Sequence, residues 1–177
     1  KFEKYARKCL QYENIHLRVI TLRNDFGSSA LANLRLIAPP VYKPLSLEAD
    51  KNLKIKYPIK IGFFGQFRKE KNLDAFLDAF VEMKFTKPVE LIVQGATAKP
   101  EDSKAFEELK KAYSDYNNIT FWHKNLLGIE WEKALLGVDV IIMPYAAERY
   151  RYHWSAMLFT AIGFYKPVLI SPEINPE

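Results

Sequence analysis

The chain of 177 residues is 49% hydrophobic and carries a formal net charge of +5 at pH 7. This length allows one domain with a substantial core, or one domain plus part of another. A single cysteine, Cys9, excludes an internal disulfide framework and agrees with a reducing compartment. No apolar run approaches the roughly 20 residues that cross a bilayer, so we expect no membrane-spanning helix.

The positive charge is concentrated in the first third of the chain. Residues 1–60 hold 12 Lys and Arg against 5 Asp and Glu, whereas residues 61–177 hold 14 against 16. Two interpretations stay open: a solvated basic face, or a surface that docks on anionic lipid headgroups. Nucleic acid is not an expected partner, because no Lys and Arg cluster is interleaved with aromatic residues in a nucleic-acid-binding motif.

The beginning of the chain predicts short elements. An apolar stripe at helical spacing predicts a helix over residues 1–11, and a strand is expected over 17–22. Turn residues from position 24 precede an expected short helix through Leu34, and a strand over 35–38 follows. Prolines then end regular structure, so the polar stretch to position 57 is expected to be a connection.

From Ile59 onward, strands and helices alternate. The expected strands, which are continuous apolar runs, cover 59–65, 89–95, 119–123, 138–143 and 168–170; the expected helices cover 72–84, 103–116, 129–136 and 154–163. Continuous apolar strands are typical of a parallel sheet whose two faces are both covered. The sequence therefore predicts an α/β fold, a Rossmann-like doubly wound parallel sheet with helices on both faces, in which ligands bind at the carboxyl ends of the strands.

The loop after the first of these strands carries a glycine and three cations. Gly65 allows close approach of a ligand to the backbone, and Arg68, Lys69 and Lys71 lead into the next helix. Lys71 stands at the helix entrance, where an ammonium group and free backbone N–H groups could neutralise a diphosphate together. The alternative is a solvated turn with surface lysines.

A second polar loop follows the strand that ends at Met143. Its side chains include two arginines and several tyrosines, a composition that suits a ligand with both sugar hydroxyls and phosphates. Ser155 is expected to cap the following helix, whose N-terminus could then face phosphate oxygens. The alternative is an aromatic-rich interface or a packed surface loop.

Other kinds of site have less support in the sequence. His123, at a strand end, could contact a ligand or have a structural role, and His16 and His153 show no metal-ligand spacing with Cys9. No Ser-His-Asp pattern, Walker loop or complete G-x-G-x-x-G fingerprint is present. The sequence therefore does not favour a dehydrogenase or a P-loop protein, and we expect no metal.

In the order of its segments, the chain resembles the C-terminal, nucleotide-sugar-binding domain of GT-B-fold glycosyltransferases of the group 1 family. The resemblance covers residues 17–171. The segments that carry it are Arg35–Val41 at the interdomain connection, Gly65-Gln66 and Lys71-Asn72 in the first loop, Glu90–Gly95, the strand Asp139–Pro144, and the helix-to-strand segment Thr160–Val168. The resemblance implies that residues 1–58 are the end of an N-terminal domain plus the interdomain connection, and that residues 59–177 are a truncated C-terminal donor-binding domain.

The chain also departs from the family pattern. The loop arginine of the family falls on Gln66, so Arg68 would have to supply that charge. The paired glutamates of its E-x7-E motif fall on Tyr152 and Thr160, and the glycine before Lys-Pro falls on Tyr165. A tyrosine-rich loop at 152–158, similar to a variant of some polysaccharide-building members, stands in that place.

What the resemblance implies is a glycosyltransferase, of hexosyltransferase type, that moves a sugar from a nucleotide-diphosphate donor to a polysaccharide or glycolipid acceptor without a metal. The donor-binding residues would be Gly65, Gln66, Arg68, Lys71, His123, Tyr145, Arg149, Arg151, Tyr152, Ser155 and Thr160. No catalytic residue is assigned, although Glu148 is a candidate.

Because the chain opens at Lys1 without an initiator Met or a signal-peptide pattern, we expect a cytoplasmic piece of a longer protein. The N-terminal domain of that protein would be missing, and the piece would be inactive alone. Contact with the inner face of the membrane rests only on the basic first third. The alternatives are an epimerase or phosphorylase-like relative with the same sheet, and a non-catalytic Rossmann-like binding or assembly module with a degenerate nucleotide site.

Overall fold

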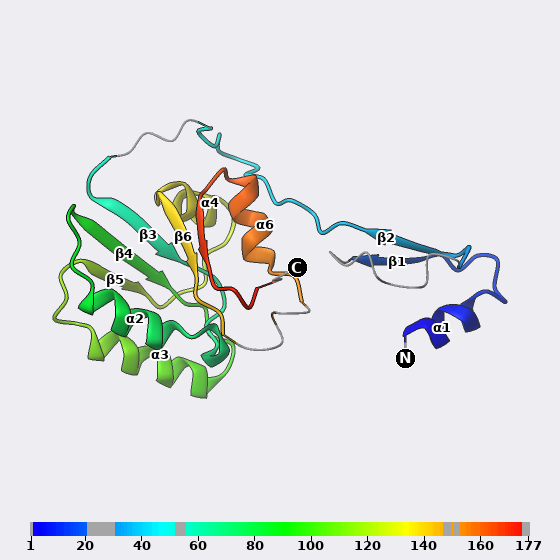
Figure 1. The fold of residues 1–177 in the computed structure, drawn as a ribbon, viewed down its shortest axis with the longest axis horizontal. Coiled ribbons are helices and arrows are strands. Elements are labelled where there is room, and N and C mark those ends of the chain that lie inside the picture. Colours follow the sequence, from blue (N-terminus) through cyan, green and yellow to red (C-terminus); the bar gives the residue numbers. More distant parts are fainter. Residues whose placement is uncertain (1, 21–30, 52–55, 147–149, 151–152, 175–177) are drawn as a thin grey trace. The chain divides into compact units, whose positions relative to one another are not determined.

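The computed structural model of the chain describes residues 2–20, 31–51, 56–146, 150 and 153–174 (Figure 1). It divides into two compact units, Lys1–Pro40 and Val41–Glu177, and each is described by itself.

The first unit contains one helix and a pair of strands. Helix α1 spans Phe2–Cys9, and strands β1 (Leu17–Ile20) and β2 (Leu34–Ile37) pair in parallel, with Leu17 opposite Leu34. Ala6, Leu31 and Leu34 form its small core. Most of the short helix predicted from position 24 lies outside the described residues, but its predicted end at Leu34 is wrong, because Leu34 begins β2.

The second unit is built on a five-stranded parallel sheet. Its strands are β3 (Ile59–Phe63), β4 (Val89–Gln94), β5 (Ile119–Trp122), β6 (Val140–Met143) and β7 (Val168–Ile170). Their order in the sheet is β5-β4-β3-β6-β7, and every neighbouring pair is parallel. The order reverses between β3 and β6, so the carboxyl ends of these two strands flank the place where doubly wound sheets bind ligands.

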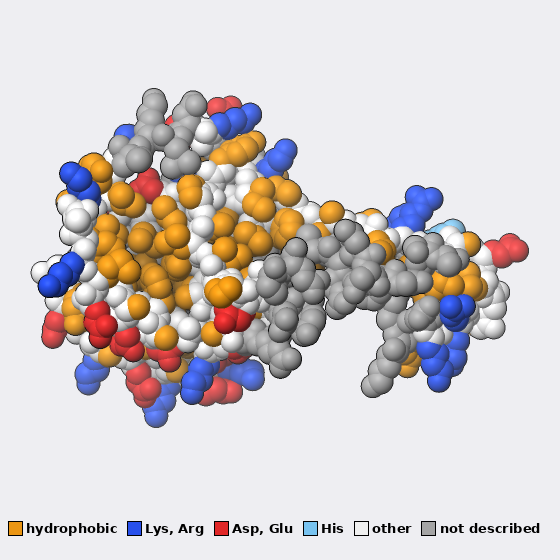
Figure 2. Space-filling model, viewed as in Figure 1, with side chains coloured by type: hydrophobic (Ala, Val, Ile, Leu, Met, Phe, Trp, Pro, Cys, Tyr) orange, Lys and Arg blue, Asp and Glu red, His pale blue; other side chains and the backbone are white. Residues whose placement is uncertain are grey.

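Helices connect these strands and cover both faces of the sheet, which confirms the predicted fold class (Figure 1). The helices are α2 (Leu73–Glu82), α3 (Pro100–Ala112), α4 (Gly128–Leu136) and α6 (Ala156–Gly163). Helix α3 begins three residues before the predicted start at Ser103, because Pro100 suits the first helical turn and two acidic residues follow it. Its outer surface is polar, with Lys and Glu side chains interleaved around α2 and α3 (Figure 2).

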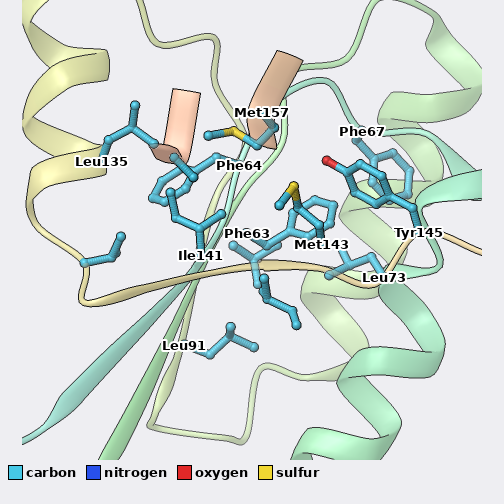
Figure 3. Close-up of a cluster of buried hydrophobic side chains, with 14 of the residues drawn as sticks. Phe63, Phe64, Phe67, Leu73, Leu91, Leu135, Ile141, Met143, Tyr145 and Met157 are labelled. Atoms are coloured by element: carbon cyan, nitrogen blue, oxygen red, sulfur yellow. The ribbon is translucent and has the colours of Figure 1, made fainter. Parts of the chain in front are cut away.

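Consecutive aromatic residues at the end of β3 fill the core on the two faces of the sheet. Phe63 and Phe64 are at most 1% exposed, and alternation along the strand points them to opposite faces. Phe64 packs edge-on against Trp131 of α4, with ring centroids 5.9 Å apart, and lies beside Met157 (Figure 3). Leu73 of α2 is buried in the same core. This packing fixes the end of β3, from which the first polar loop starts.

A carboxylate on α4 holds the connecting segment that precedes the sheet. Glu132 is 6% exposed, and its two oxygens accept backbone N–H bonds from Leu45 (2.8 Å), Ser46 (3.0 Å) and Leu47 (2.9 Å). These bonds to the charged form lower the pKa of Glu132, against the opposing effect of burial. The segment just after Pro40 therefore belongs to the second unit; the domain boundary expected at residues 58 and 59 stays a prediction.

In the described part of the chain, no helix has the length and the apolar character needed to cross a membrane.

We expect Glu132→Gln to lower the thermal unfolding midpoint, because the amide places N–H groups against backbone donors. The exposed Glu130→Gln on the same helix is the matched control and should leave the midpoint unchanged. The folded-state pKa of Glu132 lies below its ordinary value of 4.5, so its stabilisation is present above that pH and is lost as the pH falls through the folded-state value. The difference between wild type and Glu132→Gln should therefore shrink in acid; equal midpoints at neutral pH would contradict the role of the carboxylate.

Candidate functional site

A buried side chain of β4 fixes the position of the loop after β3. Gly65 adopts φ +108°, a conformation that favours glycine, and its N–H donates to Gln94 Oε1 at 2.9 Å. Gln94 is only 1% exposed, and its Nε2 donates to the carbonyl of Lys124, after β5, at 2.5 Å. One amide therefore joins the loops that follow β3 and β5 and fixes their separation.

Lys71 lies at the end of the same loop and points inward. It closes a short 3-10 turn, η2 (Lys69–Lys71), and the left-handed Asn72 (φ 53°) then leads into α2. The side chain is 8% exposed, with Nζ 5.6 Å from the ring centroid of Phe63 and 5.1 Å from that of Tyr145. The ammonium group therefore lies between the first polar loop and the second, at the carboxyl ends of β3 and β6.

The surroundings of Lys71 disfavour its charged form. Burial, followed by the nearby Arg68, lowers the pKa of Lys71 from 10.5 to about 8, and Glu70 partly offsets this. Within the described part of the chain, Nζ makes no hydrogen bond or ion pair, and the two aromatic rings are its nearest contacts. A buried cation of this kind is a strong binding group for an anion that enters the loop.

The other predicted cation of this loop, Arg68, has protein partners. Its Nη2 donates to Gln66 Oε1 at 2.9 Å, its Nη1 lies 3.8 Å from a carboxylate oxygen of Glu70, and its side chain is 38% exposed. Because Gln66 accepts from Arg68 through its oxygen, its amide nitrogen can still donate. Arg68 is therefore a more exposed positive charge than Lys71, and protein groups already hold it.

The second polar loop meets the first through Tyr145. This residue is 2% exposed, its ring lies 4.6 Å from that of Tyr150, and burial raises the pKa of its hydroxyl. The next backbone N–H, of Ala146, donates to the carbonyl of Glu70 at 3.4 Å. The two polar loops therefore meet at these residues; of the other predicted site residues, Glu148, Arg149, Arg151 and Tyr152 lie outside the described residues.

Two predicted site residues on α6 use their hydroxyl groups inside the protein. Ser155 stands at the expected N-cap position, but its hydroxyl makes no cap bond and points to the sulfur of Met143, 4.0 Å away. The expected side-chain cap is wrong, because the buried Ser155 hydroxyl packs toward β6 instead of turning over the helix end. Thr160 is buried one turn further on, and its hydroxyl donates to the carbonyl of Ala156 at 2.9 Å.

A cavity of about 550 Å³ adjoins the loop at the carboxyl ends of β3, β4 and β5. Gly65, Gln66, Gln94, Thr97, Asn125 and Trp131 are among its lining residues. The predicted residue His123 bonds to one of these, Thr97, at 2.9 Å through Nε2, and its Nδ1 bonds to Glu107 of α3. The sequence points to the residues that follow these strands, and Thr97 is one of them. It does not single out Gln94 within β4 or Trp131 on α4, which only the fold brings to the cavity.

No group of His, Cys, Asp and Glu side chains in the described ranges has the arrangement of a metal site.

We predict that Lys71→Met stabilises the protein at neutral pH by roughly 1–3 kcal/mol, because it removes a buried charge that has no ion-pair partner among the described residues, at the cost of two cation–π contacts. Exposed Lys69→Met, in the same turn, should change the free energy of unfolding little.

The folded-state pKa of Lys71 is lowered, so wild type gains stability as the pH rises from about 8 toward the ordinary value of 10.5. The advantage of Lys71→Met should therefore shrink over that range in urea unfolding curves. A Lys71→Met protein less stable than wild type at pH 7 would show that Lys71 contributes favourably to folding.

No protein-family model and no curated protein matches the chain. Solved structures do match it. One is the C-terminal domain of a glycosyl transferase group 1 family protein, LpcC, from Francisella tularensis, with 20% identity and a TM-score of 0.51 over 75% of this chain and 69% of that one. A second is sucrose-phosphate synthase from Thermosynechococcus elongatus, with 17% identity and a TM-score of 0.52 over 79% of this chain and 36% of that one.

A third is Anabaena Alr3699/HepE in complex with UDP and glucose, with 11% identity and a TM-score of 0.59 over 98% of this chain and 50% of that one. The chain thus spans half or less of the two longer proteins. At these identities the likeness establishes the fold. The second unit is a Rossmann-like α/β domain of the kind found in the C-terminal halves of GT-B glycosyltransferases, as the order of sequence segments predicted.

Proposed function

We propose that this chain is the donor-binding part of a glycosyltransferase that moves a sugar from a nucleoside-diphosphate donor to a polysaccharide or glycolipid acceptor. The observation that carries the proposal is the buried ammonium of Lys71, which has no ion-pair partner among the described residues and lies at the carboxyl ends of β3 and β6, beside a cavity of about 550 Å³. A diphosphate is the kind of anion that such a cation would neutralise, and the cavity can hold the rest of a nucleotide.

The proposed chemistry is stabilisation of a leaving group. As the bond between sugar and diphosphate breaks, negative charge grows on the diphosphate oxygens, and a fixed cation in a water-poor site lowers that barrier. Lys71 is fixed by the rings of Phe63 and Tyr145. Arg68, at the edge of the loop, adds a second and more exposed positive charge. In this scheme no metal is required, and the acceptor contacts lie in an N-terminal domain.

A cytoplasmic location is part of this proposal, and the single cysteine of the chain agrees with a reducing compartment. The excess of Lys and Arg in residues 1–60 supports peripheral contact with anionic lipid on the inner face of the membrane. The acceptor would then be presented at that surface.

A second function of a different class is a non-catalytic binding or assembly module. Tyr152 and Thr160 stand where the resemblance implies glutamates, and the Thr160 hydroxyl is bonded within its own helix. Both facts favour a site that has lost its catalytic carboxylates. Nucleotide binding without transfer, in the full-length protein, would be its signature.

Titration calorimetry with UDP, GDP and their sugars tests the proposal. We expect micromolar binding to wild type, a loss of roughly 10–100-fold in Lys71→Ala, and little change in Lys69→Ala, because only Lys71 is buried against the loop. Affinity should also fall as the pH rises through about 8, where Lys71 loses its proton. Absence of binding to any nucleotide would contradict the proposal.

The isolated chain should bind the donor but transfer sugar poorly or not at all, because the acceptor contacts are assigned to another domain. Radiolabelled transfer assays with lipid-linked and free saccharide acceptors measure this. Robust turnover by the isolated chain would show that the acceptor contacts lie within these 177 residues.

A further inference from the structure

A hydroxyl group at the wall of the cavity is held by residues behind it. Thr97 follows β4 and lines the cavity together with Gly65 and Trp131. Its Oγ1 lies 2.9 Å from His123 Nε2, and the other ring nitrogen, Nδ1, bonds to a carboxylate oxygen of Glu107. The three side chains come from the ends of β4 and β5 and from α3, so the sheet and one helix fix their geometry.

The direction of the hydrogen bonds follows from what each group can donate. An ionised carboxylate only accepts, so Nδ1 of His123 must carry the proton that it shares with Glu107. This hydrogen bond lowers the pKa of Glu107, in keeping with its ionised form. In the neutral form of His123 there is no second ring proton, so Nε2 accepts and the Thr97 hydroxyl donates to it; in the protonated form the direction of this bond would reverse.

The consequence appears on the other side of Thr97. With His123 neutral, the Thr97 proton is committed to Nε2, and the Thr97 oxygen then offers only lone pairs to the cavity. Gln94, also at the wall, is held in place because its Oε1 accepts from Gly65 and its Nε2 donates to Lys124, and its remaining N–H group can only donate. Thr97 is therefore a fixed acceptor in this part of the wall.

The rest of the cavity suits a planar ring. Leu126 and Trp131 supply apolar surface, and Gln66 and Asn125 supply amides. The cavity also shares Gly65 with the Lys71 loop: a side-chain carbon added to Gly65 would lie 3.3 Å from Lys71 Nζ. An anion held at Lys71 would therefore leave its organic part at this cavity, where base faces can stack and a base edge can be read.

We propose that the cavity holds the nucleobase of the donor, and that Thr97, oriented by His123 and Glu107, selects a base with a ring N–H group. Uracil and guanine carry such a group on the edge used for base pairing, whereas cytosine and adenine carry a lone pair on the corresponding ring nitrogen. A ring N–H group of uracil or guanine forms a hydrogen bond to the Thr97 oxygen. The ring nitrogen of cytosine or adenine would instead place its lone pair against a lone pair of that oxygen, and no hydrogen bond forms. This inference rests on the proposed function and adds the class of base.

Calorimetry with UDP against CDP, and with GDP against ADP, measures the selection. Wild type should prefer UDP or GDP by about tenfold over its partner nucleotide, the size expected for one hydrogen bond that the wrong base leaves unmade. Thr97→Val keeps the shape and removes the acceptor, so the preference should fall toward one. Thr97→Ser, the matched control, keeps the hydroxyl and should retain the preference.

His123→Phe separates orientation from mere presence of the hydroxyl. A phenyl ring can keep the packing of His123 against Phe106, whose ring centroid lies 4.9 Å away, but it cannot accept the Thr97 proton. Freed from His123, the hydroxyl can donate or accept, so binding of CDP or ADP should strengthen and the preference should shrink. A thermal unfolding curve for each variant confirms that the comparison is made on folded protein.

The outcomes distinguish this inference from the proposed function on which it rests. Nucleotide binding that Lys71→Ala abolishes, with a base preference that Thr97→Val and His123→Phe leave unchanged, would overturn the selection by Thr97 alone. Equal wild-type affinity for both members of each pair would overturn it too. No binding of any nucleoside diphosphate to wild type would overturn the proposed function and this inference with it.

Discussion

The burial of the Lys71 ammonium between Phe63 and Tyr145 is the interaction on which the candidate site depends. It joins the loop after β3 to the loop after β6, two segments far apart in the sequence that become neighbours because β6 pairs beside β3. Burial of the ammonium opposes folding, since desolvation lowers the pKa of the lysine to about 8. The buried lysine gives the site a fixed cation, which can bind an anion without the reorganisation that a solvated lysine would need.

Around this cation, the site is built by side chains whose polar atoms are already used. Gln94 spans two loops, Arg68 is held by Gln66 and Glu70, and Ser155 points back to β6. These bonds position the backbone, and among the described side chains of the site they leave few groups free to meet a ligand. The same device appears away from the site, where Glu132 gathers backbone N–H groups of the connecting segment and fastens it to α4. In both places a buried polar side chain determines where a loop lies.

Much of the fold could be predicted from sequence because it depends on local patterns. Continuous apolar runs marked the strands of the second unit, and helical spacing marked the helices between them, with ends that moved by a few residues, as at Pro100 of α3. The side-chain contacts of the candidate site were harder to predict from the sequence. A lysine in a polar loop gives no local sign of its burial, which comes from the ring of Tyr145, and the bonds of Thr97 to His123 and of His123 to Glu107 join three separate elements. Ser155 had the composition of a cap, but packing against Met143 decided where its hydroxyl points.

The most direct measurement is the titration of Lys71 itself by NMR, observing its side chain as the pH is raised, with and without a nucleoside diphosphate. We predict that the pKa of Lys71 is about 8 in the free protein, and that it rises when UDP or GDP binds, because the diphosphate favours the charged ammonium. A titration at the ordinary lysine value of 10.5 would contradict the burial of the ammonium. A lowered value that no nucleotide changes would contradict its role as the anion-binding group.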